Sequence, residues 1–164
     1  MNMKTLILIA EEGERKLIEQ YLPHIQADVL VTGVGAYNIM RSLRDLPLDT
    51  DIVNIGYAGS ANYAIGSVVE VTESRLNHPC VTYPEPVFPL QTLGLPVADY
   101  QAVCYSGTDF VTQSDYRDCV FDMELAFIVG MGFRHVRSVK IVSDNLSLHA
   151  YREFGAGVDA RTAE

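Results

Sequence analysis

Hydrophobic residues gather in short runs along the chain, and the segments after some of these runs have helical spacing. Continuous apolar runs at residues 5–10, 27–35 and 50–56 have the length of buried strands. The segments 11–22 and 36–46, which follow the first two runs, carry apolar residues three or four positions apart, as an amphipathic helix does. The first third of the chain is therefore predicted to alternate strand and helix.

Later runs extend the same pattern. Three further strands, one turn and one helix are predicted, the strands at 67–76, 102–106 and 136–144, the small-residue turn at 57–62, and a turn followed by a helix within 114–133. Alternation of this kind predicts an α/β fold with three layers, in which helices cover both faces of a mostly parallel, mixed central sheet.

One long segment has neither the apolar run of a buried strand nor the spacing of an amphipathic helix. Five of the seven prolines fall within residues 78–99, which contain few helix formers and are predicted to form an irregular loop. Long irregular segments frequently carry binding or contact functions. We therefore expect a lid or a subunit contact here.

Length and composition restrict the possible functions. The 164 residues are 48% hydrophobic and 20% charged, which suits one soluble domain over residues 1–164. A net charge of −9 would repel nucleic acid and anionic lipid, so neither is an expected partner. No run approaches the roughly 20 apolar residues of a transmembrane helix. Because Cys80, Cys104 and Cys119 lack disulfide or zinc spacing, we expect reduced thiols, a cytoplasmic location and no metal.

Polar residues close the last predicted strand. The β-branched run there stops on Ser143, Asp144 and Asn145, although Asp and Asn are depleted in strands. A helix N-cap would explain them. Equally, the carboxyl ends of strands in an open α/β sheet are where ligands bind. Both interpretations stand at this level.

A GxG sequence occurs where the second strand is predicted to meet a helix. Gly33 and Gly35 would let backbone N–H groups approach an anion or a ribose, or they would only form a tight turn. A dinucleotide fingerprint needs a third glycine where Asn38 stands. Dinucleotide binding, with Asp51 as the ribose contact, is therefore the weaker interpretation.

Two more groups of residues are candidates for a binding site. The small residues of 55–61, including Gly56, Ala58 and Gly59, leave room either for a ligand or for close packing. Phe110 follows a strand and has a face suited to stacking on a heterocycle, although a lone aromatic is more often part of the core.

Two carboxylates bracket Met123 at the start of an apolar helix. Acidic residues in a first helical turn are favoured by the helix dipole, and this alone would explain why Asp122 and Glu124 occur there. A carboxylate against an apolar core nevertheless needs a partner. Sugar hydroxyls are suitable partners.

These segments occur together in one order. The series VTGVGAYN, VNIGYAGSANYAIGSVVEV, YSGTDFV, DMELAFI and KIVSDN resembles the purine nucleoside phosphorylase and methylthioadenosine/S-adenosylhomocysteine nucleosidase superfamily. The resemblance covers most of the chain. It implies a nucleoside phosphorylase-like α/β/α fold and cleavage of the N-glycosidic bond of a purine nucleoside, through a transition state resembling a ribosyl oxocarbenium ion.

The resemblance also implies residue roles. Asp144 would be the general acid at the purine N7, with Ser143 orienting it, because a partly apolar pocket can raise a carboxyl pKa toward neutrality. Glu124 would bind the ribose hydroxyls beside Met123, and Phe110 would stack on the base. Carboxylate contact would also stabilise the positive charge on the sugar.

The nucleophile depends on two further features. In the nucleosidase branch a glutamate after the first strand activates water, and Glu14 is the best match, with Glu11 and Glu12 as its neighbours. Residues 33–37 contain no arginine for a phosphate cradle, which favours water over phosphate. Lys140 stands where the family often has arginine, so some affinity for anions is left open.

The remaining expectations complete this hypothesis. Substrate contacts are expected from the residues at the two glycine turns and their surroundings, namely Gly35, Tyr57, Ala58, Gly59, Phe110, Met123, Glu124 and Ser143. No cofactor is expected, with phosphate as co-substrate only in a phosphorolytic enzyme.

The chain is short for the family between Arg75 and Cys104 and after Asp144, so a trimmed sheet, completed by a homo-oligomer, is expected. A phosphorylase and a nucleoside- or base-binding homologue without turnover are the alternatives.

Overall fold

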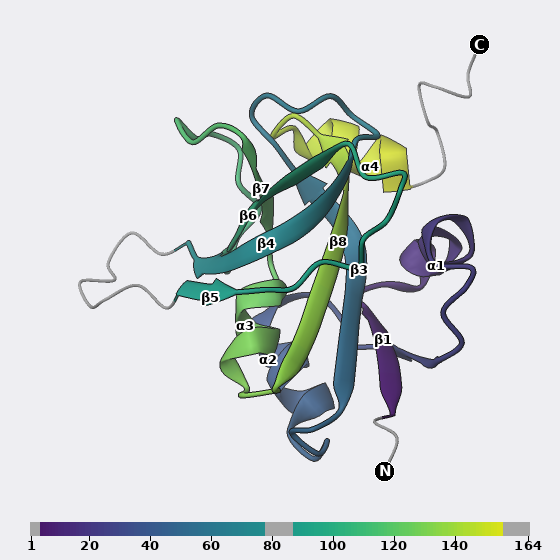
Figure 1. Ribbon diagram of the computed structural model, residues 1–164. Coiled ribbons are helices and arrows are strands. Elements are labelled where there is room, and N and C mark those ends of the chain that lie inside the picture. The colour runs from purple at the N-terminus through teal and green to yellow at the C-terminus, as the bar shows by residue number, and fades with distance from the viewer. Residues whose placement is uncertain (1–3, 78–86, 156–164) are drawn as a thin grey trace.

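The structure is a computed structural model that describes residues 4–77 and 87–155 (Figure 1). Its strands are β1 (Thr5–Ile9), β2 (Asp28–Val31), β3 (Asp51–Gly59), β4 (Val68–Leu76), β5 (Val87–Pro89), β6 (Tyr100–Ser106), β7 (Cys119–Asp122) and β8 (His135–Asp144). Its helices are the 3-10 helix η1 (Glu12–Glu14) and the α-helices α1 (Arg15–Tyr21), α2 (Gly35–Leu43), α3 (Leu125–Gly130) and α4 (Leu148–Gly155).

All eight strands belong to one mixed sheet in which most pairs are parallel. At the centre, β3 pairs in parallel with β1 on one side and with β8 on the other, and β1 pairs in parallel with β2. Beyond β8 the sheet continues through β4 and β6 to β7, which returns to β3 at the antiparallel pair Gly59 and Phe121. Strands β3, β8, β4, β6 and β7 therefore form a closed circuit, and β1 and β2 extend from it.

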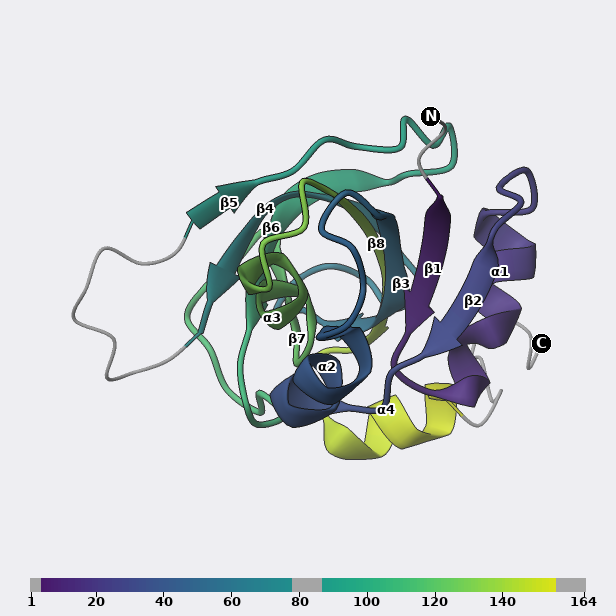
Figure 2. The same ribbon diagram turned by 90° about the horizontal axis from the view of Figure 1, so that it is seen from below.

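Helices cover both faces of the part of the sheet formed by β1, β3 and β8, and each face has its own core (Figure 2). On one face Ile39 of α2 and Leu125 and Ile128 of α3 pack against the strands. On the other face Leu17 of α1 packs there, and α4 adds Phe154. Each fully buried aliphatic side chain of this kind contributes about 1.5–3 kcal/mol. The predicted α/β fold with helices on both faces is confirmed.

Outside the proline-rich segment, the element assignment differs from the sequence prediction at three places. Residues 57–59, predicted as a turn, extend β3, because Tyr57 and Ala58 pair in register with β8. Strand β7 was predicted as part of a turn and helix, yet it pairs in parallel with β6. Helix α4 was not predicted. In each case pairing or packing with distant residues overrides a weak local signal.

Only part of the proline-rich segment lies within the described residues, since 78–86 are outside them. Strand β5 pairs antiparallel with β4, and the irregular residues after it include Leu95, which is buried in the core beneath α1 and α4. The Leu95 N–H donates to the carboxylate of Glu70 over 2.7 Å. The described part of this segment is thus packed onto the core. Among the described helices none has the length and apolar character needed to cross a membrane.

Candidate active site

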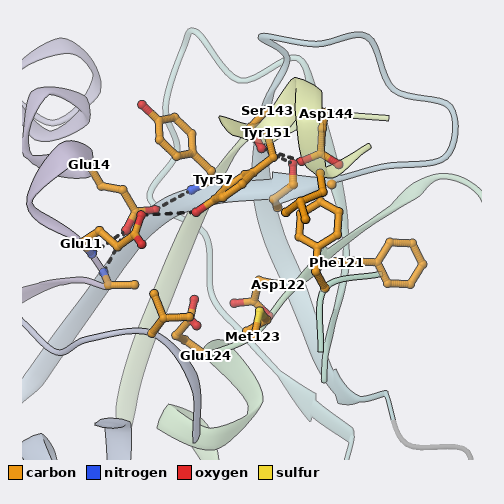
Figure 3. Close-up of a pocket in the computed structure, with 16 residues that line it drawn as sticks. Glu11, Glu14, Tyr57, Phe121, Asp122, Met123, Glu124, Ser143, Asp144 and Tyr151 are labelled. Carbon is orange, nitrogen blue, oxygen red and sulfur yellow. Dashed lines mark hydrogen bonds between the residues drawn. The ribbon is translucent and has the colours of Figure 1, made fainter. Parts of the chain in front are cut away.

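A cavity of about 210 Å³ lies at the carboxyl ends of β1, β3, β7 and β8 (Figure 3). Its lining residues come from these strand ends, from the loops after these strands and after β2 and β6, and from η1 and α4. They are Ala10, Glu11, Glu14, Val34, Tyr57, Ala58, Gly59, Phe110, Phe121, Asp122, Met123, Glu124, Ser143, Asp144, Leu148 and Tyr151. Five are carboxylic acids, and no lysine, arginine or histidine is among them. The cavity is therefore an acidic site with aromatic walls.

Asp144 reaches the cavity because β8 is irregular at its end. Successive residues of a regular strand point to opposite faces, but the register shifts between Ala58 and Gly59, so that Gly59 pairs with Asp144. Ser143 and Asp144 consequently both line the cavity. The Ser143 hydroxyl donates to Asp144 Oδ2 over 2.8 Å, and the Leu146 N–H donates to Oδ1 over 2.8 Å. Burial raises the pKa of Asp144, although these donors oppose it.

Glu14 is held by the backbone. Its Oε1 accepts N–H groups of Ala10 and Glu11 at 2.9 and 3.1 Å, and its Oε2 accepts the Tyr57 N–H at 2.8 Å. Because β1 and β3 are neighbours, the loop after β1 brings Glu14 over the end of β3. Burial raises the pKa of Glu14, and the charge of Lys140 and the three N–H donors limit the rise.

Glu124 lines a third side of the cavity, apart from Asp144 and Glu14. It is the residue before α3, and its Oε2 accepts the Gly35 N–H at the start of α2 over 2.9 Å. Burial and the nearby charge of Asp122 raise the pKa of Glu124 to about 8. Figure 3 shows the carboxylates of Glu14, Glu124 and Asp144 on different sides of one cavity. Met123 lines it next to Glu124.

Asp122 and Lys140 form an ion pair in the interior. Lys140 Nζ lies 2.9 Å from Asp122 Oδ2, and only 1% of each side chain is exposed. The Ser106 hydroxyl donates to Oδ1 of Asp122, and the Leu125 N–H donates to Oδ2 over 2.9 Å. Asp122, expected in the first turn of a helix, is instead the last residue of β7 and binds the N-terminus of α3. Lys140, for which some affinity for anions was left open, is paired with Asp122 in the interior.

This pair fixes the charges of both partners. Burial disfavours the Lys140 ammonium, but Asp122 and other acidic neighbours outweigh burial and raise the pKa of Lys140. Burial also disfavours the Asp122 carboxylate, but Lys140 and Ser106 outweigh it, and the pKa of Asp122 is lowered. Lys140 is therefore a cation and Asp122 an anion at neutral pH.

Aromatic side chains form the walls. The rings of Phe110 and Tyr151 lie 5.5 Å apart between centroids, and the Tyr151 ring lies 6.5 Å from that of Tyr57. Tyr57 makes an edge contact with Phe154 at 5.2 Å. The Tyr151 hydroxyl donates to Glu11 Oε2 over 3.3 Å, which links α4 to the loop after β1. Helix α4 thus closes one side of the cavity.

The structure brings together nearly all residues selected from the sequence. Of these, Tyr57, Ala58, Gly59, Phe110, Met123, Glu124, Ser143, Asp144 and Glu14 line the cavity. Gly35 does not line it, because its N–H is turned to Glu124. Gly33 and Gly35 both have positive φ, 89° and 88°, so the turn itself requires glycine. Both glycines are therefore needed for the turn, and the N–H of Gly35 also binds Glu124, the residue expected to contact the ribose.

Sequence reasoning missed two parts of the cavity. Tyr151 comes from the unpredicted α4, and Phe121 comes from the unpredicted β7. Asp51, considered as a ribose contact for a dinucleotide, is at the start of β3, where Arg137 and Thr5 bind its carboxylate. It therefore lies at the opposite end of β3 from the cavity.

The described residues contain no cluster of three or more His, Cys, Asp or Glu side chains arranged to hold a metal ion. Cys104 and Cys119 are buried free thiols, and burial raises the pKa of each, as the thiolate form is disfavoured there. Cys80 lies outside the described residues. Neither described thiol lines the cavity.

No protein-family model and no curated protein sequence matches the chain. Solved structures nevertheless resemble it. A variant of the nucleosidase MTAN from Chlamydia trachomatis, bound to MTA, has 18% sequence identity and a TM-score of 0.75, and the match covers 96% of this chain and 91% of that one. The methylthioadenosine/S-adenosylhomocysteine nucleosidase of Streptococcus pneumoniae with a transition-state inhibitor has 19% identity and a TM-score of 0.72, with coverage of 98% and 95%.

A third solved structure is also similar to this chain in fold and low in sequence identity. The corresponding nucleosidase of Helicobacter pylori has 15% identity and a TM-score of 0.71, with coverage of 95% and 92%. The expected trimming is therefore not seen against these proteins, since the chain spans at least 91% of each of the three. This chain has the nucleoside phosphorylase-like fold of the methylthioadenosine/S-adenosylhomocysteine nucleosidases.

Proposed function

We propose that the protein hydrolyses the N-glycosidic bond of a purine nucleoside. Asp144 donates a proton to N7 of the base as the bond between N9 and C1′ breaks. Glu14 accepts a proton from the water that attacks C1′, and Glu124 binds the ribose hydroxyls. The observation that carries the proposal is the convergence of these three carboxylic acids on one cavity with aromatic walls.

The environment of Asp144 supports its role as the acid. A general acid works best when its pKa is close to the working pH, and burial raises the pKa of Asp144 in that direction. The Ser143 hydroxyl bonds to Oδ2 and the Leu146 N–H to Oδ1, which fixes the direction of the carboxyl group. An oriented acid with a raised pKa favours departure of a base whose N7 is protonated.

The environment of Glu14 supports its role as the base. Three N–H donors hold the carboxylate in one orientation and oppose the effect of burial on its pKa. An ionised base whose pKa is raised is a better proton acceptor than an ordinary carboxylate. Charge that develops on the sugar ring is stabilised by the acidic lining as a whole.

Water is favoured over phosphate as the nucleophile. A phosphate cradle needs cations or several free N–H donors, and no basic side chain lines the cavity. Lys140, whose charge acts on Glu14 and Glu124, is paired with Asp122. Those carboxylic acids of the lining that are ionised would also repel a phosphate dianion. Phosphorolysis is therefore the weaker alternative, and no cofactor is proposed.

The similar structures support the substrate class. The Chlamydia trachomatis protein is bound to MTA, and the Streptococcus pneumoniae protein is complexed with MT-ImmA, a transition-state inhibitor. By analogy of fold, an adenine nucleoside with an uncharged 5′ substituent is the first candidate substrate. The acidic lining adds an argument from this chain itself, because it disfavours a 5′-phosphate.

An assay of base release tests the proposal. Methylthioadenosine, adenosylhomocysteine, inosine and adenosine are incubated with the protein, with and without phosphate, and both base and sugar products are identified. We expect a free base and an unphosphorylated sugar from at least one nucleoside, whether or not phosphate is present. No release above the Asp144→Asn variant would reject catalysis, and tight nucleoside binding without release would favour a binding homologue. A sugar phosphate would indicate a phosphorylase.

Two further expectations follow from the resemblance, a homo-oligomer and a cytoplasmic location. An apolar groove over α2 and α3, which includes the exposed side chains Tyr37 and Met40, is compatible with a subunit contact. Light scattering at several concentrations measures the subunit count. A mass of 18.2 kDa at every concentration would contradict the homo-oligomer.

A further inference from the structure

Lys140 is a lysine with almost no contact with solvent, and it has one acidic partner. Lysine is very rarely buried to this extent unless it is paired, and removing two charges from water costs free energy that the attraction between them only partly returns. Apolar residues in the same place are often as stable. Stability alone therefore does not account for the pair.

The pair joins the strands on either side of β3 to helix α3, which follows β7. Lys140 is on β8, where it lies in register with Gly56 of β3, and Asp122 ends β7. Asp122 accepts the Leu125 N–H, and Ser106, which donates to Asp122, accepts the Ala126 N–H over 2.9 Å. The first N–H groups of α3 are thus bound through Asp122, and Asp122 is bound by Lys140.

Glu124 lies between these fixed points. Asp122, two residues before it, accepts the N–H of Leu125, the residue after it, so the backbone that carries Glu124 has little freedom. The backbone of Glu124 is not helical, with φ of −129° and ψ of −42°, and its side chain turns away from α3 to the Gly35 N–H. The Asp122–Lys140 pair thereby fixes the place from which the carboxyl group of Glu124 enters the cavity.

Charged groups face Glu124 from three elements. Asp122 of β7 and Glu14 of η1 disfavour its ionised form, and Lys140 of β8 favours it. The Gly35 N–H also favours the ionised form. Lys140 in turn faces Asp122, Glu124 and the Cys104 thiol of β6. Lys140 and Asp122 therefore act on Glu124 with opposite signs.

We propose that Asp122 and Lys140 are positioning residues for the reaction, which act by placing and tuning the carboxyl group of Glu124. This inference rests on the proposed function, in which Glu124 binds the ribose. It differs from the role of an anion site, because the ammonium of Lys140 has no access to the cavity.

Three variants separate positioning from a merely structural role: Lys140→Met, Asp122→Asn, and both changes together. The double variant leaves neither charge alone, and the amide at position 122 can still accept the Leu125 N–H, so it carries the test if Lys140→Met does not fold. The control replaces Arg137 by Met and Asp51 by Asn, which removes an ion pair from the other end of β3 and β8.

Two readouts are measured on the full chain. The first is the titration of the Glu124 carboxyl group by carbon NMR, which needs no activity. We expect Lys140→Met to move this titration to higher pH and Asp122→Asn to move it to lower pH, with no movement in the control. The second is kcat/KM for the cleaved nucleoside, which we expect to fall on the order of 100-fold in the double variant and to stay unchanged in the control.

Failure of this inference and failure of the proposed function have different signatures. Base release absent from the wild-type protein would reject the function, and the titration would still decide whether the pair acts on Glu124. A titration that is the same in all variants would overturn the inference. So would a double variant that folds and has the kcat/KM of the wild-type protein.

Discussion

Gly56 leaves the space that the carboxyl group of Glu14 occupies. A Cβ atom on Gly56 would lie 2.5 Å from Oε2 of Glu14, which is closer than any side chain tolerates. Because three N–H groups hold Glu14 in place, it has no free direction in which to move. The glycine on β3 is thus a requirement of the proposed base and not of the strand.

The first prediction follows from this contact. Gly56→Ala displaces the Glu14 carboxyl group, and a misplacement of about 1 Å lowers the rate on the order of 100-fold. Gly130→Ala is the matched control, because a Cβ atom there would meet nothing within 4 Å. Steady-state kinetics of base release compares the two. Full activity in Gly56→Ala would mean that Glu14 is not the base.

The second prediction concerns the proposed acid. Asp144→Asn keeps the size of the side chain and its hydrogen bond with Ser143 but removes the proton that is donated to N7. We expect kcat to fall by roughly 100- to 10,000-fold, with nucleoside affinity changed much less. Asp49→Asn, on the exposed loop before β3, is the control. Equal losses of affinity and of rate would point to a binding role for Asp144.

Much of the fold was predictable because its central strands are strongly apolar. Strands β1, β3 and β8 have long apolar runs, and their buried pattern is a direct signal for a covered sheet. Strand β7 has only four residues and joins the apolar sequence of α3 after two residues. An apolar run of that length has no period by which strand and helix can be told apart.

The site was predictable where chemistry and position in the sequence coincide. Asp144 ends an apolar strand, and Glu14 follows one, so both were expected at the carboxyl edge of the sheet. The partner of Asp122 was not predictable, because Lys140 is 18 positions away and meets it only when β7 and β8 flank β3. The contact between Tyr151 and Glu11 spans 140 positions and has no local signal either.

The third prediction concerns base binding. Phe110 lines the cavity beside Tyr151, with their ring centroids 5.5 Å apart, and an aromatic ring stacked on a base contributes about 1–3 kcal/mol. Phe110→Ala should therefore weaken nucleoside binding by roughly 5- to 150-fold. Isothermal calorimetry measures the change, with Tyr116→Ala as the control because its side chain is exposed and does not line the cavity. Unchanged affinity in Phe110→Ala would exclude stacking on this ring.

The fourth prediction concerns the pH dependence of stability. The pKa of Glu124 rises from its ordinary value of 4.5 to about 8 in the folded protein. Between these values the folded state holds a proton that the unfolded chain has released, so this group lowers the free energy of unfolding as pH rises. The decrease is up to about 1.4 kcal/mol per pH unit within that window.

Glu124→Gln removes this contribution while keeping an oxygen that accepts the Gly35 N–H. We therefore expect the variant to lose less stability than the wild-type protein between about pH 5 and pH 8, when both are unfolded with urea. Effects of titrating groups that do not interact with Glu124 cancel in the comparison. Parallel curves for the two proteins would show that the pKa of Glu124 is not raised on folding.

A crystal structure with adenine tests the central arrangement most directly, because it shows whether the three carboxylic acids surround a purine. The account predicts adenine in the cavity of Figure 3, with N7 about 3 Å from a carboxyl oxygen of Asp144, the ring against Phe110, and Glu14 and Glu124 facing the space left for the ribose. Adenine bound elsewhere, or bound with N7 turned away from Asp144, would contradict it.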